Sequence, residues 1–292
     1  MSLELKNITK CYGKKTVLNG LDLTLEEGKI YGLVGRNGAG KTTMLSIASA
    51  QNPTTKGEIM LDGETVWENQ KCLNQICFSR EIVNSADNVS SALKVKEYLR
   101  MAQMLFPYWD KEMADRLVEE FELDEKQKIM KLSKGMQSMI TIIVALASKA
   151  KYTFLDEPAA GLDVVARENF YRLLLDEYSE SGRTFVISTH IIEEAADVFE
   201  EVIFLNKGTI MLKENTEELL SRCIHISGKA EDVDDIIKGK RAFHQEKMGR
   251  SKGITLMLDG GEIFDKKGRD VEVSPLSLQD VFVALCGREE KL

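Results

Sequence analysis

The stretch GRNGAGKTT, residues 35–43, decides the fold of this chain. It fits the phosphate-binding pattern G-x-x-x-x-G-K-[ST]. Residues 29–34 (KIYGLV) before it are an apolar run of strand type, and residues 43–50 are typical of a helix start. Glycines let successive N–H groups point into one pocket, and the following helix adds its positive end. This context favours a polyphosphate-binding loop over a glycine-rich turn without a ligand. Its candidate contact residues are Gly35, Asn37, Gly38, Gly40, Lys41, Thr42 and Thr43.

The composition indicates a soluble globular protein. The chain has 292 residues, of which 43% are hydrophobic and 29% are charged, enough for one large domain or for a large and a small one. Its longest apolar stretch, residues 139–147, is too short to cross a bilayer, and residues 1–10 hold no apolar signal core. We therefore expect a cytoplasmic protein, unless a partner holds it at a membrane.

The cysteines and the net charge argue against several function classes. The five cysteines are scattered without a C-x-x-C pair, which predicts buried free thiols rather than a zinc site or a disulfide framework. The formal net charge of −8 gives no broad electrostatic footprint for DNA or RNA. No nucleic acid partner is therefore expected.

The apolar pattern predicts an α/β core. Residues 152–156 (YTFLD) and 184–189 (TFVIST) are continuous apolar runs, typical of strands buried in a parallel sheet. Helices are expected between these strands at about 164–180 and after them at 191–198. Apolar residues at three- and four-residue spacing predict more helix over 92–150.

Two further regions flank this core. Residues 1–30 carry alternating apolar segments with glycine turns, which predict an antiparallel β-subdomain, and Asp62-Gly63 marks a hairpin turn. From about residue 218, short strand-like pieces mix with two helix candidates, 230–239 (AEDVDDIIKG) and 277–286 (SLQDVFVALC). This mixture predicts a small C-terminal α+β appendage.

Two acids stand at the end of the run 152–156. Asp156 lies where a magnesium-side carboxylate belongs; the Thr42 hydroxyl is expected at the same ion, and Lys41 at the β- and γ-phosphates. Strand alternation places the Glu157 side chain on the opposite face, which suits a base that polarises the attacking water. The alternative is a plain acidic pair at a strand end, which the upstream phosphate loop disfavours.

His190 follows the run 184–189 and is a second catalytic candidate. The carboxyl edge of an open α/β sheet faces the ligand crevice, so a histidine there is expected to contact the γ-phosphate and position the water. Its alternative is a histidine satisfied by nearby backbone. A further motif, LSKGMQ at 132–137, is by itself also compatible with a plain helix N-cap at Ser133.

Residues 1–215 resemble the ATP-binding cassette (ABC) ATPases in the order of their motifs. That order is the phosphate loop, LSKGMQ, the acidic strand end, the triplet 161–163 (GLD) and His190. The resemblance implies an ATPase that uses ATP and Mg²⁺. Its expected fold is a P-loop NTPase core with an antiparallel β-subdomain and a helical subdomain at about 84–150. The ABC domain would then cover 1–217 and an accessory domain 218–292.

The resemblance also implies roles for residues outside the phosphate loop. Tyr12 matches the aromatic residue that stacks on adenine, with a half-buried strand tyrosine as the alternative, and Asp163 matches a loop that communicates across a dimer. ABC ATPases work as head-to-tail dimers, here a homodimer or a heterodimer with another ABC ATPase. In such a dimer, Ser133 and Gly135 of one chain close over the triphosphate bound by the other.

Two segments depart from the commonest form of the family. In LSKGMQ, Lys134 stands for a glycine and Met136 for a glutamine, while Ser133 and Gly135 remain. The glutamine that links Mg²⁺ to the transmembrane partner is matched by Glu81, at the end of the segment 76–81. Glu81 is therefore a further candidate metal ligand.

The implied partner is a separate transmembrane permease, with this chain on the cytoplasmic face of the cell membrane. The LSKGMQ motif and the C-terminal piece resemble those of bacterial exporter-type (ABC-2-like) ATPases, so export is expected over import. The six methionines within 92–140 are expected to fill the core, with a docking groove for a permease helix as the alternative. The rival functions are a soluble ABC ATPase acting on ribosomes or DNA, and a nucleotide sensor with little turnover.

Overall fold

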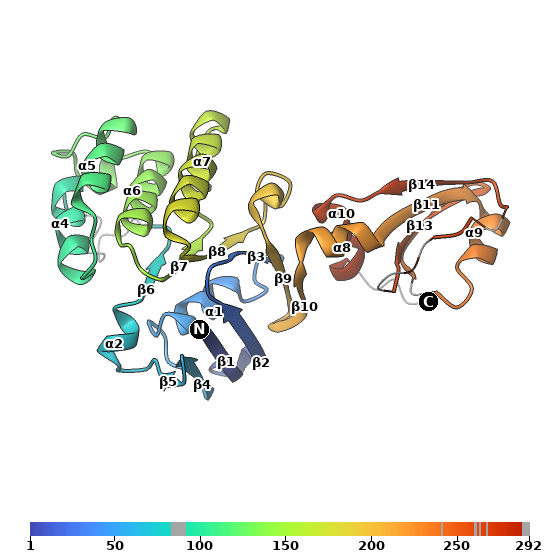
Figure 1. Ribbon diagram of the computed structural model, residues 1–292, viewed down its shortest axis with the longest axis horizontal. Helices are drawn as coiled ribbons and strands as arrows, with labels where there is room; N and C mark the ends of the chain where they lie inside the picture. The colour runs from blue at the N-terminus through green and yellow to red at the C-terminus, as the bar shows by residue number, and fades with distance from the viewer. Residues whose placement is uncertain (83–91, 241, 260–261, 263, 267, 288–292) are drawn as a thin grey trace.

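The computed structural model describes residues 1–82, 92–240, 242–259, 262, 264–266 and 268–287. Of the predicted helical subdomain at 84–150, residues 84–91 lie outside this described part. The molecule is elongated, with a separate C-terminal sheet at one end and a larger N-terminal body, which holds the phosphate loop, making up the rest (Figure 1). No described helix combines the length and the apolar character that a bilayer span requires.

The central sheet places the phosphate loop. It has six strands in the order β10-β9-β3-β8-β7-β6, and β3 runs parallel to its neighbours β8 and β9, while β10 is antiparallel to β9. All residues of β3, β7 and β8 are buried, as predicted for the two downstream runs. The strands are β3 (Ile30–Val34), β6 (Ile76–Ser79), β7 (Tyr152–Asp156), β8 (Thr184–Thr189), β9 (Glu201–Asn206) and β10 (Thr209–Asn215).

The predicted antiparallel β-subdomain is a four-stranded sheet in the order β2-β1-β4-β5. In the hairpin between β4 and β5, Asp62 and Gly63 have φ of 51° and 82°, the left-handed backbone that a two-residue turn of this kind requires. The sequence prediction of this turn is therefore confirmed. The strands are β1 (Ser2–Tyr12), β2 (Lys15–Glu26), β4 (Lys56–Leu61) and β5 (Glu64–Thr65).

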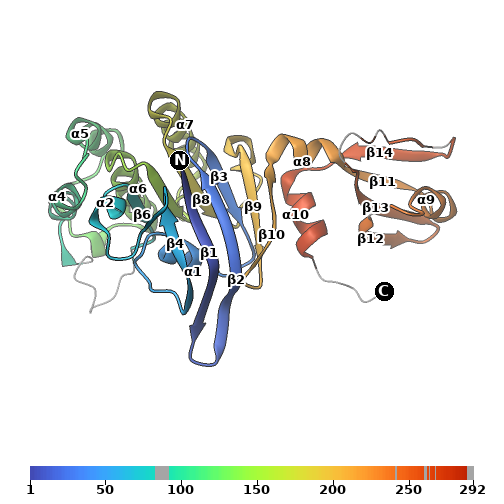
Figure 2. The ribbon, with the colours of Figure 1, turned by 60° about the horizontal axis from the view of Figure 1, so that its bottom comes forward.

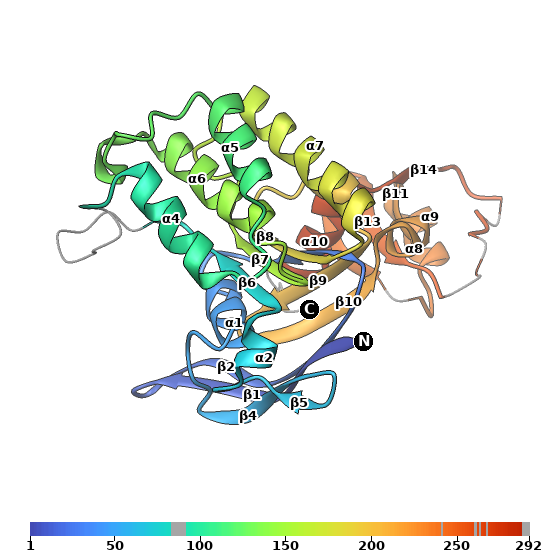
Figure 3. The ribbon, with the colours of Figure 1, turned by 60° about the vertical axis from the view of Figure 1, so that its left-hand side comes forward.

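Two hydrophobic clusters cover the two faces of the central sheet. Within β3, Tyr31 and Leu33 join a cluster with the N-terminal sheet and α1, while Ile30 and Val34 join a cluster with the other helices. This alternation follows from the period of two in a strand. Figure 3 shows α4, α5, α6 and α7 above the sheet and β1, β2, β4 and β5 below it. The helices are α1 (Lys41–Ala48), α2 (Gln70–Leu73), α4 (Val95–Leu105), α5 (Lys111–Glu120), α6 (Lys134–Ala147) and α7 (Val164–Ser181), with a 3₁₀ turn η1 (Ile129–Lys131).

The prediction of a helix at 191–198 is wrong. The chain makes turns there and forms only the short 3₁₀ helix η2 (Ala196–Val198). The Thr189 hydroxyl accepts a hydrogen bond from the Ile191 N–H at 3.0 Å, a local bond that competes with helix. Phe199 is 5% exposed and lies so close to β3 that a Cβ on Gly32 would come within 2.3 Å of its ring. Burial of this ring against β3 places the end of this segment against the sheet.

The C-terminal region forms a four-stranded antiparallel sheet in the order β12-β13-β11-β14, seen at the right of Figure 2. It has its own small core, in which Ile226, Ile254 and Leu256 of the sheet meet Val233 and Ile236 of α9. The elements are α8 (Thr216–Arg222), β11 (Cys223–Lys229), α9 (Ala230–Ile236), β12 (Ala242–Met248), β13 (Ser251–Met257), β14 (Val271–Pro275) and α10 (Leu278–Cys286).

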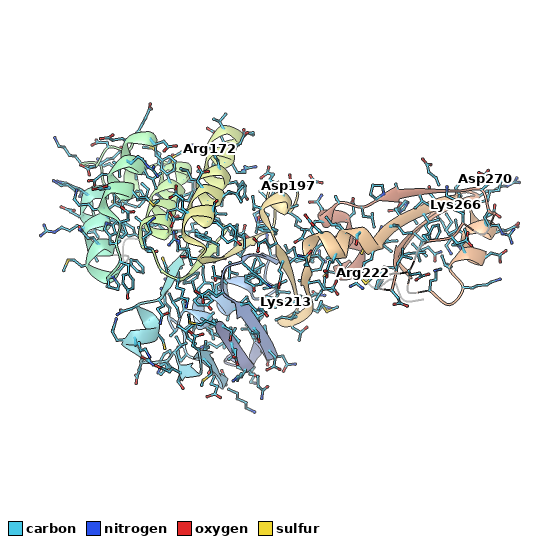
Figure 4. The ribbon with its side chains drawn as sticks, viewed as in Figure 1. Arg172, Asp197, Lys213, Arg222, Lys266 and Asp270 are labelled. Atoms are coloured by element: carbon cyan, nitrogen blue, oxygen red, sulfur yellow. The ribbon has the colours of Figure 1, made fainter. Side chains whose placement is uncertain are left out.

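Helices α8 and α10 connect this sheet to the rest of the molecule. The ring of Phe282 on α10 meets that of Phe204 on β9 edge-on, with centroids 5.2 Å apart. In Figure 4, Lys213 marks β10 at the side of the N-terminal sheet, where it pairs with Glu26 at 2.6 Å, and Arg222 marks the end of α8. Because α8 starts at Thr216, one helix runs across the predicted boundary between 217 and 218.

The cysteines are free thiols, as predicted, and four of the five are buried. Burial raises the pKa of Cys77, Cys223 and Cys286 to about 11. These thiols therefore stay protonated near neutral pH and are poor nucleophiles.

Candidate active site

The phosphate loop follows β3 and ends at α1, as the motif requires. Gly38 and Gly40 have φ of 80° and 111°, which side chains rarely adopt, and Gly40 is the N-cap of α1. A Cβ on Gly35 would lie 2.6 Å from the Leu205 carbonyl oxygen of β9. The glycines are thus required by backbone conformation and by close approach, not only by a ligand.

Lys41 lies inside the site and is 7% exposed. Its Nζ donates to the Gly35 carbonyl oxygen at 2.7 Å and lies 3.4 Å from Glu157 Oε1. A buried ammonium group needs such partners. The structure therefore brings the phosphate-loop lysine and the candidate base together.

The backbone conformation of Glu157 differs from the predicted continuation of the strand. The strand β7 ends at Asp156, and Glu157 has φ of 51°, so strand alternation does not extend to it. Its N–H bonds to the Ser188 carbonyl oxygen at 3.1 Å and to the Ser188 hydroxyl at 3.1 Å. On the other side, Glu157 Oε2 lies 2.7 Å from His190 Nδ1. Glu157 thus lies between Lys41 and His190.

Asp156 is 9% exposed and accepts a hydrogen bond from the Ser188 hydroxyl at 2.5 Å. A carboxylate oxygen here and the exposed Thr42 hydroxyl are hard donors of the type that Mg²⁺ prefers. The described residues hold no group of three or more His, Cys, Asp or Glu side chains that would cage a metal.

Ser188 was not predicted from the sequence. It is fully buried and touches both acids, because its hydroxyl donates to Asp156 and accepts from the Glu157 N–H. The polarity of these two bonds is fixed, since a carboxylate only accepts and an N–H only donates. A hydroxyl within the apolar run 184–189 was the available signal, because a buried serine needs polar partners.

Tyr12 lies at the end of β1 and is 50% exposed. The Asn52 side-chain amide donates to its hydroxyl at 2.6 Å, and Lys10 Nζ lies 5.0 Å from the ring centroid. The ring is therefore accessible and is held in place. Lys10 and Asn52 were not predicted from the sequence.

Ser133 is the N-cap of α6, and its hydroxyl accepts from the Met136 N–H at 3.2 Å. Asp163 is likewise the N-cap of α7 and accepts from the Ala166 N–H at 2.8 Å. The two loops touch, because a Cβ on Gly135 would lie 2.7 Å from the Gly161 carbonyl oxygen. The segments that carry Ser133 and Asp163 thus meet at Gly135 and Gly161, and the hydrogen bonds described for both N-caps run to their own helices.

Glu81 pairs with Lys134, with Oε1 and Nζ 2.9 Å apart, and both side chains are largely exposed. This hydrogen bond raises the pKa of Lys134. The two departures from the family pattern are therefore partners in this chain. A metal-binding role for Glu81 stays a prediction.

A glycine-rich loop at a helix N-terminus, with a buried lysine, an acid at the end of another strand of the same sheet and a second acid held by a histidine, defines the class of P-loop nucleotide hydrolases. The family described as ABC transporter matches residues 18–160. The chain is also 34% identical over 232 residues to the Fe(3+) ions import ATP-binding protein FbpC 1 of Haemophilus influenzae, covering 75% of this chain and 67% of the relative. This chain belongs to the ABC transporter ATP-binding family, a family of ATPases.

Other relatives match from end to end. The chain is 25% identical to the ABC transporter ATP-binding protein YtrB of Bacillus subtilis, covering 99% of each chain. It is 28% identical to the Nod factor export ATP-binding protein I of Cupriavidus metallidurans, covering 98% of each. Among solved structures, a dimeric post-hydrolysis state of the ATP-binding cassette MJ0796 bound to ADP and Pi matches with a TM-score of 0.63 and 26% identity, over 73% of this chain and 98% of that one.

Proposed function

We propose that this chain hydrolyses ATP with Mg²⁺ and thereby energises a separate membrane permease, in the direction of export. The observation that carries the ATPase site is the contact series from Lys41 through Glu157 to His190, at the end of a phosphate loop. Sequence places these residues far apart, and the fold brings their charged groups within hydrogen-bonding or ion-pair distance. The chemistry that such a group supports is attack of water on a phosphoanhydride.

Each residue has a distinct task in this proposal. The N–H groups of the phosphate loop and Lys41 bind the β- and γ-phosphates, so the triphosphate takes over the role of Glu157 as the anionic partner of Lys41. Glu157 then accepts a proton from the attacking water, and His190 holds the Glu157 carboxylate in place. Asp156 and Thr42 hold Mg²⁺, which supplies charge neutralisation at the phosphate oxygens.

The proposed working unit is a head-to-tail dimer. Ser133 and Asp163 cap their own helices and both are exposed, so a second chain can reach them. The N-terminus of α6, a helix of 14 residues, offers positive charge for the triphosphate of the second chain. The dimeric state of the MJ0796 cassette supports this arrangement.

The proposed permease partner is supported by an apolar face of the helical subdomain. Met101, Met104, Leu105 and Tyr108 recur at helical spacing on and just beyond α4 and are 47% to 79% exposed. The opposite face of α4 carries the buried Val95, Leu99 and Ala102. The exposed apolar strip lies beside the polar side chains Lys96, Glu97, Arg100 and Gln103 of the same helix. An exposed apolar strip with a polar border is typical of a contact with a second protein, and flexible methionines suit docking. We place the chain on the cytoplasmic face of a membrane through this contact.

Export is favoured by where the relatives match. The export ATPase of Cupriavidus metallidurans aligns with 98% of this chain, so its match includes the C-terminal region. The match to the iron import protein covers 75% of this chain. We therefore propose an ABC domain at 1–217 and a C-terminal accessory domain at 218–292 that belongs to the export type.

The test is ATP turnover by the purified chain, with and without the permease that it is proposed to serve. We expect turnover that depends on Mg²⁺. Met104→Glu should weaken association with the permease, because it puts a charge into the apolar contact, and should leave ATP affinity unchanged. Glu112→Gln, an exposed change on the neighbouring α5, serves as the control. Turnover without Mg²⁺, or association unaffected by Met104→Glu, would contradict the respective part of the proposal.

A further inference from the structure

A group of contacts around Tyr12 lies outside the phosphate loop. Asn52 Nδ2 donates to the Tyr12 hydroxyl at 2.6 Å, and Lys10 Nζ lies 5.0 Å from the ring centroid, within range of a cation–π contact. An exposed tyrosine ordinarily samples several rotamers. Here Asn52 holds the Tyr12 hydroxyl and the Lys10 ammonium group contacts the ring, although half of Tyr12 is exposed to solvent.

Lys10 is more buried than a surface lysine. It is 8% exposed, and its Nζ donates to Asn52 Oδ1 at 2.7 Å and to the Pro53 carbonyl oxygen at 2.6 Å. An ammonium group loses much of its hydration on burial, so it needs this number of partners. Two oxygens and an aromatic ring satisfy it. The contacts among Lys10, Asn52 and Tyr12 therefore form a partly buried, hydrogen-bonded cluster and not a chance contact at the surface.

Asn52 also connects Tyr12 to the helix that follows the phosphate loop. The Asn52 N–H donates to the Ser46 carbonyl oxygen at 3.1 Å, and Nδ2 lies 3.5 Å from Ser46 Oγ. Ser46 belongs to α1, which starts at Lys41. The position of the Tyr12 ring is thereby fixed relative to the helix whose first residue binds phosphate.

We propose that Asn52 and Lys10 are positioning residues that hold Tyr12 as a rigid stacking platform for the base of the nucleotide. This inference rests on the ATP site proposed above and on the expectation, from the resemblance to the ABC ATPases, that Tyr12 stacks on adenine. A ring that is already ordered loses less side-chain entropy when a base stacks on it, so the base binds more tightly. The platform touches the base and not the reacting phosphate. It therefore contributes equally to the ground state and the transition state, and its loss changes KM rather than kcat.

Asn52→Ala in the full-length chain tests the platform. We expect the Kd and the KM for ATP to rise about three- to tenfold while kcat stays within about twofold. Inorganic tripolyphosphate with Mg²⁺, which has no base, should bind equally to the wild type and to the variant in a competition titration. Lys10→Met, which keeps the length of the stem and removes the charge, should give the same pattern.

Tyr12→Ala supplies the reference for these effects. It should weaken ATP binding about 10- to 100-fold, the range expected for loss of one base–aromatic stack. In this background, Asn52→Ala should cause no further loss. An equal loss of ATP and tripolyphosphate affinity in Asn52→Ala would overturn the inference, because it would show that Asn52 supports α1 instead. An additive loss in the double variant would also overturn it. If the wild type bound neither ATP nor tripolyphosphate, the proposed ATP site itself would fail.

Discussion

The central sheet and the C-terminal sheet of this chain are built from different kinds of strand. All residues of β3, β7 and β8 are buried, whereas most described residues of β12 are exposed. Asp156 ends β7, while Glu157 and His190 directly follow β7 and β8, and the fold brings Glu157 and His190 together with Lys41. Among the described residues, the C-terminal sheet and α9 share a core of six buried hydrophobic residues, and α8 and α10 join this region to the rest of the molecule. The candidate active site thus lies at the C-terminal ends of the central strands, whereas the C-terminal sheet mainly presents exposed residues.

The largest effect that the comparison predicts lies at Glu157. Glu157→Gln removes the base while the amide keeps the size of the side chain, so turnover should fall by about 10²- to 10⁴-fold. ATP affinity should be retained, and the ATP-bound dimer should accumulate because hydrolysis no longer opens it. Steady-state turnover and light scattering in the presence of ATP measure both. Glu168→Gln, an exposed change on α7, is the control. Turnover at the wild-type rate would remove Glu157 from the mechanism.

A second large effect is expected at Lys41. Lys41→Ala removes the buried cation that is proposed to bind the phosphates, so the Kd for ATP should rise at least about tenfold. Isothermal titration calorimetry measures this directly, and Lys14→Ala, at an exposed position before β2, should have no effect. An unchanged Kd in the Lys41 variant would mean that this lysine does not contact the ligand.

Ser188→Ala tests the link between the two acids and should have an intermediate effect. The variant leaves the Glu157 N–H with one partner fewer and frees Asp156 to rotate, which costs about 1–3 kcal/mol. We expect kcat to fall about tenfold and the Mg²⁺ concentration for half-maximal turnover to rise. Ser148→Ala, at another buried serine, controls for the loss of a buried hydroxyl alone. If both variants behaved alike, Ser188 would be structural only.

The smallest effect on ATP is expected from the C-terminal sheet. Leu256→Ala leaves a cavity in its core and should destabilise that sheet by about 2–5 kcal/mol. The affinity for ATP should change less than about twofold, since no residue of this core contacts the phosphate loop. Thermal unfolding with and without ATP should show a stabilised transition for the ABC core and a lowered one for the C-terminal sheet. A loss of ATP binding would show that the two regions form one cooperative unit.

The parts of the fold that were predicted share a physical reason. The strands at 152–156 and 184–189 are continuous apolar runs, and the phosphate loop has a fixed spacing, so local sequence defines both. The turns at 191–198 could not be predicted, because they depend on Phe199 packing against Gly32, a contact between segments far apart in the chain. Ser188, Lys10 and Asn52 were missed for the same reason. Each acts through a partner that only the tertiary structure brings near.

The contacts of β9 have a consequence for how the two ends of the molecule are joined. The Leu205 carbonyl oxygen lies against Gly35, and the neighbouring Phe204 ring lies against Phe282 of α10. Of these two consecutive residues of β9, Leu205 therefore contacts the phosphate loop and Phe204 contacts α10. The phosphate loop and the attachment of the C-terminal region are therefore supported by the same strand, so a substitution at Leu205 or Phe204 bears on both.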